Sequence, residues 1–344
     1  MNSARLFAGG ALVGSVLTAT GFVLVQEQLR LAKDESETKD RLFKYGVPQT
    51  NITMYSYKGH SLAYDNAKRI PMWVAELLTH DTLHHSKVAH RHQSHFKLDP
   101  AVPAEYQATN SDYLGSGWSR GHMAAAANHV QDQQEMDDTF YLTNVVPQLL
   151  NNNIGYWSRL ELYCRDLAAH HKEVRVFSGP LFLPHISDGK GNDGKKYVHY
   201  EVIGRNGVAV PTHLYKVIMA DDGDGEPHLG VFVIPNEPIT GDKSLQQYQV
   251  TLKELEGHLG MKLTPHLDQK MCKDLCAIDG CKMMSREKFE LIKYAQRLRS
   301  SHDLESLEAV WREMKQRGHH PDTYTIKQYS QRKEQLLGTH NINT

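Results

Sequence analysis

The stretch "GSGWSRGHMAAAANH" (residues 115–129) places the triplet Arg120-Gly121-His122 between two glycines and a run of alanines. Glycine favours turns, and the small alanines leave space beside the imidazole. "DTFYLTNVVPQ" (138–148) alternates apolar and β-forming residues and predicts a strand, whereas "IGYWSRLELYCRDLAAH" (154–170) has apolar residues near helical spacing. The fold is therefore predicted around a histidine at the end of a strand, followed by a second strand and a helix.

The composition describes an ordinary globular chain. Its 344 residues suffice for one large domain and an appendage, with 40% hydrophobic and 23% charged residues. The net charge of −1 excludes a global positive field, so any nucleic acid must be bound by a local cluster of cations. The 4 cysteines are too few for a disulfide scaffold.

The first 25 residues are predicted to be an anchor or targeting segment. Residues 6–25, "LFAGGALVGSVLTATGFVLV", carry no charge and are long enough to cross a bilayer core of about 30 Å as a helix. A cleaved signal peptide and a soluble helix are the alternatives, although Arg5 alone would be the basic flank of a signal peptide. The sequence favours the retained anchor.

The remaining chain divides by composition into three parts. Residues 26–44 form a charged linker, residues 45–284 a core, and residues 285–344 a charged helical subdomain at the C-terminus. Within the core we expect an amphipathic helix after Pro71 and a strand over 173–183 that is broken at Gly179-Pro180. Strands are also expected over 208–220 and 228–236. The pattern predicts an α+β fold.

Two clusters of potential metal ligands lack the regular spacing that is typical of metal sites. Cys272, Cys276 and Cys281 lie close to His266, but their irregular spacing favours loop cysteines with one disulfide over a zinc site. Residues 80–95, "HDTLHHSKVAHRHQSH", hold six histidines without a regular helix face. Solvent-facing histidines that contact phosphates when protonated are the favoured interpretation.

The helix over 154–170 carries residues suited to a hydrated metal ion. Asn153 and Glu161 are eight residues apart, which in a regular helix separates their Cα atoms by about 12 Å and about 80°. Both side chains cannot bind one ion at about 2.1 Å, so one of them must act through water. A single amide ligand suits Mg²⁺, which keeps most of its waters and binds phosphate oxygens. Asn153 could instead merely cap the helix.

These segments resemble the DNA/RNA non-specific ββα-metal nucleases, also called His-Me finger nucleases. The motifs are "SRGH" (119–122), "FYLTNVVPQ" (140–148) and "NNNIGYWSRLE" (151–161), which occur in the family's order and spacing. The resemblance spans about residues 53–237 and is strongest to the mitochondrial endo/exonuclease G-like branch. It implies a largely antiparallel central sheet flanked by helices, with a C-terminal helical wing.

The resemblance also implies roles for the central residues. His122 matches the general base, Asn153 the sole direct protein ligand of Mg²⁺, and Glu161 the acid that acts on the metal through water. Mn²⁺ is an alternative metal.

Four further positions match residues that support the site or bind phosphate. Arg120 is the arginine of the triplet and Asn144 matches the asparagine that supports the histidine. Arg91 matches a transition-state arginine, with a solvated loop arginine as the alternative. Arg159 lies in the helix motif and is expected to contact substrate.

Three departures from the family pattern affect the loops. Ser119 replaces the usual aspartate before the triplet, and Ala125 stands where the branch tends to have proline. Leu149 and Leu150 occupy positions that are usually polar or acidic. These changes affect the expected shape of the loops and the way in which they would contact a nucleic-acid strand.

The expected function is a metal-dependent nuclease that hydrolyses DNA, with RNA left open as a further substrate, as a 5′–3′ exonuclease with endonuclease activity, in mitochondrial DNA repair or degradation. Residues 6–25 would hold it in the mitochondrial inner membrane with the nuclease domain facing the intermembrane space, and family members commonly form homodimers. The alternatives are a catalytically weak nucleic-acid-binding relative and a secreted scavenging nuclease.

Overall fold

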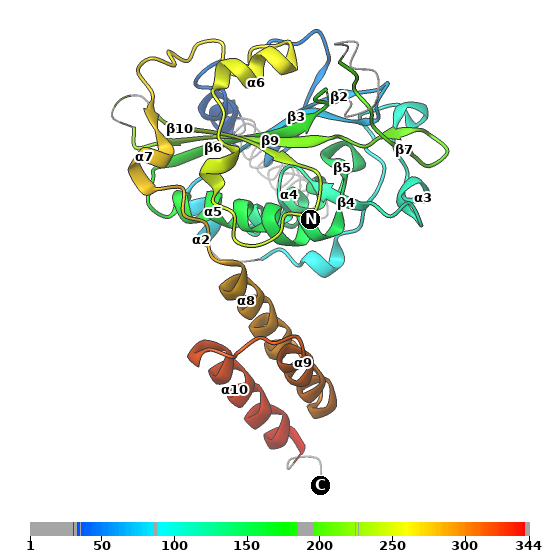
Figure 1. The fold of residues 1–344 in the computed structure, drawn as a ribbon, viewed down its shortest axis with the longest axis vertical. Coiled ribbons are helices and arrows are strands. Elements are labelled where there is room, and N and C mark those ends of the chain that lie inside the picture. The colour runs from blue at the N-terminus through cyan, green and yellow to red at the C-terminus, as the bar shows by residue number, and fades with distance from the viewer. Residues whose placement is uncertain are drawn as a thin grey trace, which may run out of the picture.

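A single twisted sheet crosses the middle of the molecule, with helices on both faces and a bundle of three helices projecting from it (Figure 1). The structure is a computed structural model. It describes residues 30, 33–34, 36–84, 88–184, 196–223, 225 and 227–340. The architecture confirms the predicted α+β class.

The central sheet has seven strands, and every neighbouring pair but one is antiparallel. The exception is β10 with β11, which run parallel. The strands, in their order across the sheet, are β1 (Met54–Ser56), β2 (His60–Asp65), β3 (Ile70–Leu78), β6 (Glu173–Leu181), β9 (His213–Asp221), β10 (His228–Pro235) and β11 (Lys273–Asp274).

Smaller elements surround this sheet. Two strand pairs lie outside it: β4 (Ser119–His122) with β5 (Val145–Gln148), and β7 (Val202–Ile203) with β8 (Val208–Ala209). The α-helices of the core are α2 (His80–His84), α3 (Asn110–Tyr113), α4 (Gln133–Thr139), α5 (Ser158–Ala168), α6 (Leu252–Leu259) and α7 (Leu275–Asp279). A π-helical segment (Asn152–Trp157) leads into α5, and 3₁₀ turns cover Arg91–Gln93, Ala104–Tyr106, Ala126–Asn128, Leu142–Asn144 and Leu245–Tyr248.

The helix predicted after Pro71 was wrong, because this segment is the strand β3. It pairs with β2 on one side and β6 on the other, and Trp73, Val74 and Ala75 are fully buried. A strand covered on both faces has no alternation of polar and apolar residues, so its pattern does not distinguish it from a buried helix. Pro71 is tolerated where the register shifts in a bulge between β2 and β3.

Two other strand boundaries differ from the prediction. β6 runs through Gly179-Pro180 without a break, and a Cβ at position 179 would lie 2.7 Å from the carbonyl oxygen of Met72. Glycine is therefore required there by close packing of neighbouring strands. The strand predicted over 138–148 is limited to β5, because its first residues end α4 and form a 3₁₀ turn.

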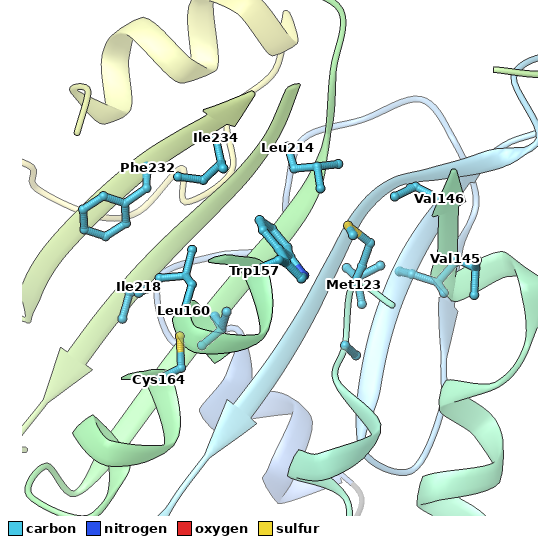
Figure 2. Packing of buried hydrophobic residues seen from close by; sticks show 14 of the residues in the cluster. Met123, Val145, Val146, Trp157, Leu160, Cys164, Leu214, Ile218, Phe232 and Ile234 are labelled. Atoms are coloured by element: carbon cyan, nitrogen blue, oxygen red, sulfur yellow. The ribbon is translucent and has the colours of Figure 1, made fainter. Parts of the chain in front are cut away.

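Each face of the sheet has its own apolar core. On one face, Trp157 and Leu160 pack among Leu214, Ile218 and Met123 (Figure 2). On the other face, Leu255 of α6 belongs to a second cluster that includes Tyr45. The two cores fix α5 and α6 on opposite faces of the sheet.

The end of the predicted linker packs against the core. Residues 36–42 are helical, and Leu42 is buried in the second apolar cluster. Arg41 Nε lies 2.7 Å from Glu173 Oε1, and Lys44 Nζ lies 2.6 Å from Asp221 Oδ2. Within the described residues no helix is long and apolar enough to cross a membrane. The predicted anchor, residues 6–25, lies outside these residues.

The C-terminal bundle consists of α8 (Arg286–Arg299), α9 (Leu304–Gln316) and α10 (Thr323–His340) (Figure 1). Ser285 and Asp303 cap the first two helices by accepting bonds from the amides of Lys288 and Ser306. The bundle has its own small apolar clusters, in which Leu298, Leu307 and Met314 are fully buried. Its helices therefore pack mainly on each other.

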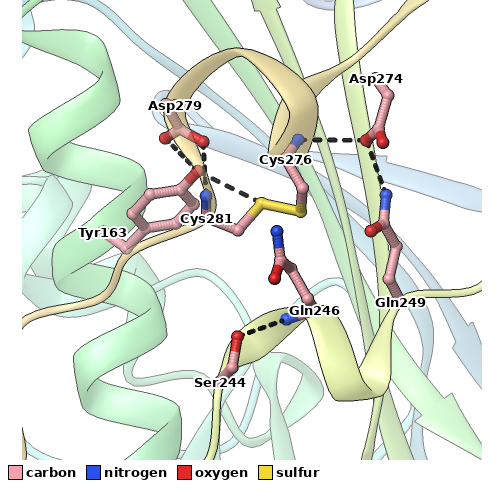
Figure 3. Close-up of a disulfide and its surroundings, with 8 residues drawn as sticks. All are labelled: Tyr163, Ser244, Gln246, Gln249, Asp274, Cys276, Asp279 and Cys281. Atoms are coloured by element: carbon pink, nitrogen blue, oxygen red, sulfur yellow. Dashed lines mark hydrogen bonds between the residues drawn. A yellow bond between two sulfur atoms is a disulfide. The ribbon is translucent and has the colours of Figure 1, made fainter.

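A disulfide joins Cys276 and Cys281 around α7 (Figure 3). Tyr163 of α5 donates a hydrogen bond from its hydroxyl to Asp279 in the same loop. The disulfide confirms the preferred interpretation of these cysteines, because bonded sulfurs are not available as zinc ligands. Cys272 lies outside this bond.

Removing the disulfide is expected to lower the free energy of unfolding. In the chain-entropy account, closing so short a loop stabilises the protein by about 2 kcal/mol. Urea unfolding of Cys276→Ser/Cys281→Ser should show this loss. Dithiothreitol should destabilise the wild-type chain equally and leave the variant unchanged. Equal stability of the oxidised chain and the variant would show that the bond contributes nothing.

Candidate active site

β4, β5 and the following helix form a ββα unit. His122 at the end of β4 pairs with Val145 at the start of β5, and Ser119 pairs with Gln148 at the other end. A Cβ at Gly121 would lie 2.2 Å from Gln148 Oε1 and 2.8 Å from its Cβ. The glycine is thus needed for close approach of the Gln148 side chain.

His122 lies in an aromatic niche. Its ring centroid is 5.0 Å from that of Phe96 and 4.8 Å from that of Phe140. Nε2 is buried and has no hydrogen-bond partner among the described residues. Burial, followed by the charges of Arg91 and Arg120, lowers the pKa of His122 to about 3. The imidazole is therefore neutral at pH 7 and keeps a lone pair for a proton.

The two predicted phosphate-binding arginines lie on either side of this niche. The guanidinium carbon of Arg91 is 5.5 Å from the centroid of Phe140, and that of Arg120 is 4.5 Å from the centroid of Phe96. Arg91 is exposed, whereas Arg120 is half-buried and donates to Asn110 Oδ1 at 2.6 Å. These positions place two cations around one buried neutral base.

Asn144 braces the chain directly after His122. Its Oδ1 accepts from the amide of Ala124 at 2.9 Å, and its Nδ2 donates to the carbonyls of Ala124 and Thr139 at 3.0 and 2.8 Å. Asn144 is fully buried, so these bonds are shielded from water. Asn144 therefore supports the histidine through the backbone.

Asn153 is not the helix cap. It lies inside the π-helical segment, and its own amide donates to the carbonyl of Leu149 at 2.9 Å. Its side-chain Nδ2 donates to Ser119 Oγ at 3.1 Å and to the carbonyl of Arg120 at 3.4 Å. These bonds orient the amide and leave Oδ1 without a hydrogen bond in the described part of the chain. π-Helical turns are often found at functional sites.

Glu161 lies in the first turn of α5, directly after the π-helical segment, and its side chain is half-buried. Burial raises the pKa of its carboxyl, against the opposing charges of Lys216 and Arg165. The angle of about 80° between Asn153 and Glu161 holds only for a regular α-helix. The π-helical turn changes that angle, because it has more residues per turn.

Arg159 is the predicted residue that lies apart from this cluster. It is buried, donates to Asp242 and to the carbonyl of Met284 at 3.1 Å, and stacks on Tyr156. These contacts place it where the core meets the C-terminal bundle.

Sequence reasoning missed three side chains that shape the site. Phe96 and Phe140 enclose His122, but they lie in loops far from it in sequence. Lys216 is fully buried in β9, donates to Ser178 Oγ at 2.6 Å and lies 4.5 Å from the ring centroid of Trp157. A lysine inside the apolar strand "HLYKVIMA" was the one available signal, since lysine is rarely buried without a function or partner.

A unit of two strands and a helix that carries a buried neutral histidine on one strand and an oriented amide at the start of the helix is the arrangement of a ββα-metal nuclease. The profile of the DNA/RNA non-specific endonuclease family matches residues 38–270, more than half of the chain. The chain belongs to this family. The match extends beyond residues 53–237, on which the resemblance was first seen, and includes the end of the charged linker.

Individual relatives agree with this assignment. "Nuclease EXOG, mitochondrial" of Xenopus laevis is 42% identical over 338 residues, covering 96% of this chain and 93% of that protein. The human protein of the same name is 38% identical over 351 residues, covering 98% and 94%. Human "Endonuclease G, mitochondrial" is 41% identical over 226 residues, covering 66% and 74%.

A solved structure of similar fold is that of an EndoG/EndoGI complex, described as showing the mechanism of EndoG inhibition. It superposes with a TM-score of 0.65 at 37% identity and covers 69% of this chain and 98% of that one. The chain is therefore a hydrolase, a metal-dependent non-specific nuclease of the mitochondrial endo/exonuclease G-like branch.

The pH dependence of cleavage should report the charges around His122. Since the pKa of His122 is about 3, the acid limb of kcat/KM should lie well below pH 6. Arg91→Gln removes a repelling charge, so the pKa rises and the acid limb moves to higher pH. Arg91→Lys keeps the charge and should leave the limb in place. An acid limb that is the same in all three proteins would contradict this electrostatic account.

Proposed function

We propose that the chain hydrolyses phosphodiester bonds of DNA and RNA with His122 as general base and a divalent cation held by Asn153. The observation that carries the proposal is the presence of two groups on one structural unit: a neutral imidazole without a hydrogen-bond partner among the described residues, and an amide whose oxygen is left available by the bonds of its nitrogen. Both groups are fixed on one ββα unit.

The donor atoms fit Mg²⁺ better than a softer metal. Asn153 offers one neutral oxygen and Glu161 a carboxylate on the same helix, and oxygen ligands suit Mg²⁺ and Mn²⁺. Asn153 would bind the ion directly, and Glu161 would act through water. When bound, the ion would neutralise phosphate charge and stabilise the departing oxygen.

His122 accepts a proton from the attacking water at Nε2. In the free protein, Arg91 and Arg120 disfavour the imidazolium. A phosphate held between these arginines offsets their charge, so the basicity of His122 rises as substrate binds. The same guanidinium groups donate to the phosphate oxygens and stabilise the additional negative charge of the transition state.

The C-terminal bundle is proposed to restrict one end of the substrate groove. A cavity of about 790 Å³ lies between the π-helical segment and α8, lined by Ile154, Arg159, Arg286, Lys293 and Arg317. Lys293 donates to the carbonyl of Ile154, one residue from Asn153, at 3.4 Å. The lining also includes Asp242, Glu287 and Glu290, so its charge is mixed. The contact of the bundle with the segment that carries Asn153 supports an exonuclease that retains endonuclease activity.

We also propose a membrane-tethered homodimer. Residues 6–25 would anchor the chain in the mitochondrial inner membrane, with the nuclease domain facing the intermembrane space. The relatives are named as mitochondrial nucleases, which favours this location over a secreted scavenging nuclease. A disulfide is maintained in oxidising surroundings and agrees with a position outside a reducing compartment.

The function is tested by cleavage of 5′- and 3′-labelled single- and double-stranded DNA and RNA by the full chain. Cleavage should require Mg²⁺ or Mn²⁺ and stop with EDTA. His122→Ala should lower kcat by about 10²–10⁴-fold, the usual contribution of a general base. The label pattern assigns the direction of degradation.

His258→Ala is the matched control, because His258 is exposed on α6 across the sheet from the site. It should cleave like the wild-type chain. DNA that is bound but not cleaved with any divalent metal would contradict the proposed catalysis and favour the nucleic-acid-binding relative.

Substitution of Asn153 tests whether its side chain binds the metal ion or only stabilises the helix. Asn153→Ala should raise the Mg²⁺ concentration for half-maximal cleavage at least tenfold, because the direct protein ligand is removed. Asn153→Asp restores an oxygen ligand and should recover part of the affinity. His258→Ala, across the sheet from the site, is again the control. An unchanged Mg²⁺ requirement in Asn153→Ala would exclude Asn153 as the ligand.

A further inference from the structure

Two histidines and an aspartate meet at the end of the core that lies away from His122. His171 follows the C-terminal end of α5, Asp222 follows β9, and His228 begins β10, next to α7 (Figure 1). His171 is 18 residues after Asn153 and lies just beyond Ala168, where the helical segment ends. From Asn153 to Ala168 the helical segment is about 22 Å long at 1.5 Å per residue, so the cluster lies far from the proposed magnesium ligand.

The three side chains converge on one point. One potential ligand atom from each of them lies within 4.8 Å of the other two. His171 Nδ1 is 2.8 Å from Asp222 Oδ1, and the two imidazole rings meet edge to face with centroids 5.4 Å apart. Within the described ranges, these three side chains are close enough together to hold one metal ion.

His228 supplies a second observation that indicates a ligand. Its Nδ1 is buried and has no hydrogen-bond partner in the described part of the chain. A buried polar atom without a partner destabilises the folded state, and a bound ion would relieve this cost. Neither the disulfide nor the lining of the substrate groove includes His228, so neither gives this nitrogen atom a role.

We propose that His171, Asp222 and His228 bind one Zn²⁺ ion, with water as the fourth ligand. Two imidazoles and a carboxylate are typical zinc ligands, whereas Mg²⁺ prefers oxygen. Ligand atoms around a tetrahedral ion with bonds of about 2.1 Å lie about 3.4 Å apart. His171 Nδ1 and Asp222 Oδ1, which are 2.8 Å apart, must therefore separate slightly, and Asp222, whose side chain is 54% exposed, has room to move.

The ion cross-links the end of α5 to the β9–β10 turn. α5 and the segment before it carry Glu161 and Asn153, so the ion stabilises the far end of the helix that holds the catalytic site. The ion makes no contact with substrate, and this inference does not depend on the proposed function.

The test is a titration of the full chain with Zn²⁺ by isothermal calorimetry, with Mg²⁺ saturating. We expect one tight Zn²⁺ site per chain and an increase in Tm when Zn²⁺ is added. Co²⁺ should give the absorption bands of a tetrahedral site. His228→Gln and His171→Gln should each weaken Zn²⁺ binding at least tenfold and abolish the increase in Tm.

His170→Gln is the matched control, because His170 is the exposed neighbour of His171 and lies outside the cluster. It should bind Zn²⁺ like the wild-type chain. Retained Mg²⁺-dependent cleavage shows that each variant is folded. A wild-type chain without tight Zn²⁺ binding, or variants that bind as tightly as wild type, would overturn the proposal.

Discussion

The buried indole of Trp157 holds the two halves of the catalytic unit together. Its Nε1 donates to the carbonyl of His122 at 3.3 Å, and its ring is fully buried among residues of the central sheet. A buried tryptophan combines a large apolar surface with one directional hydrogen bond. The strand that ends in the base and the helix that carries Asn153 are therefore fixed relative to each other.

The electrostatics of the site follow from this packing. An aromatic niche excludes water from the imidazole, and two arginines surround it, so a positive charge on His122 is disfavoured until an anion arrives. The imidazole is thus kept neutral beside two cations, as the proposed general base and phosphate-binding arginines require. The C-terminal bundle contacts the segment before the same helix, where Lys293 donates to the carbonyl of Ile154 at 3.4 Å.

The sequence was most informative where short motifs lie next to each other in space. The segments of His122 and Asn153 could be predicted to lie together because they form one local unit, and the roles of the two residues stay predictions. Segments whose environment is set by distant parts of the chain were not predictable: β3 was interpreted as a helix, since burial on both faces removed its alternation. Phe96 and Phe140 approach His122 only through tertiary packing, and nothing in the sequence signals the π-helical turn.

In the proposed mechanism, Asn153 binds a hard metal ion through its side-chain oxygen. His122 acts as the general base and does not bind the ion. The most direct test is anomalous diffraction from crystals of the protein grown with Mn²⁺. We predict an anomalous peak about 2.1 Å from Asn153 Oδ1, with no other protein atom bound to the ion and His122 Nε2 uncoordinated. A peak bonded to His122 Nε2, or no peak at Asn153 when the enzyme is active in the same Mn²⁺ concentration, would contradict the account.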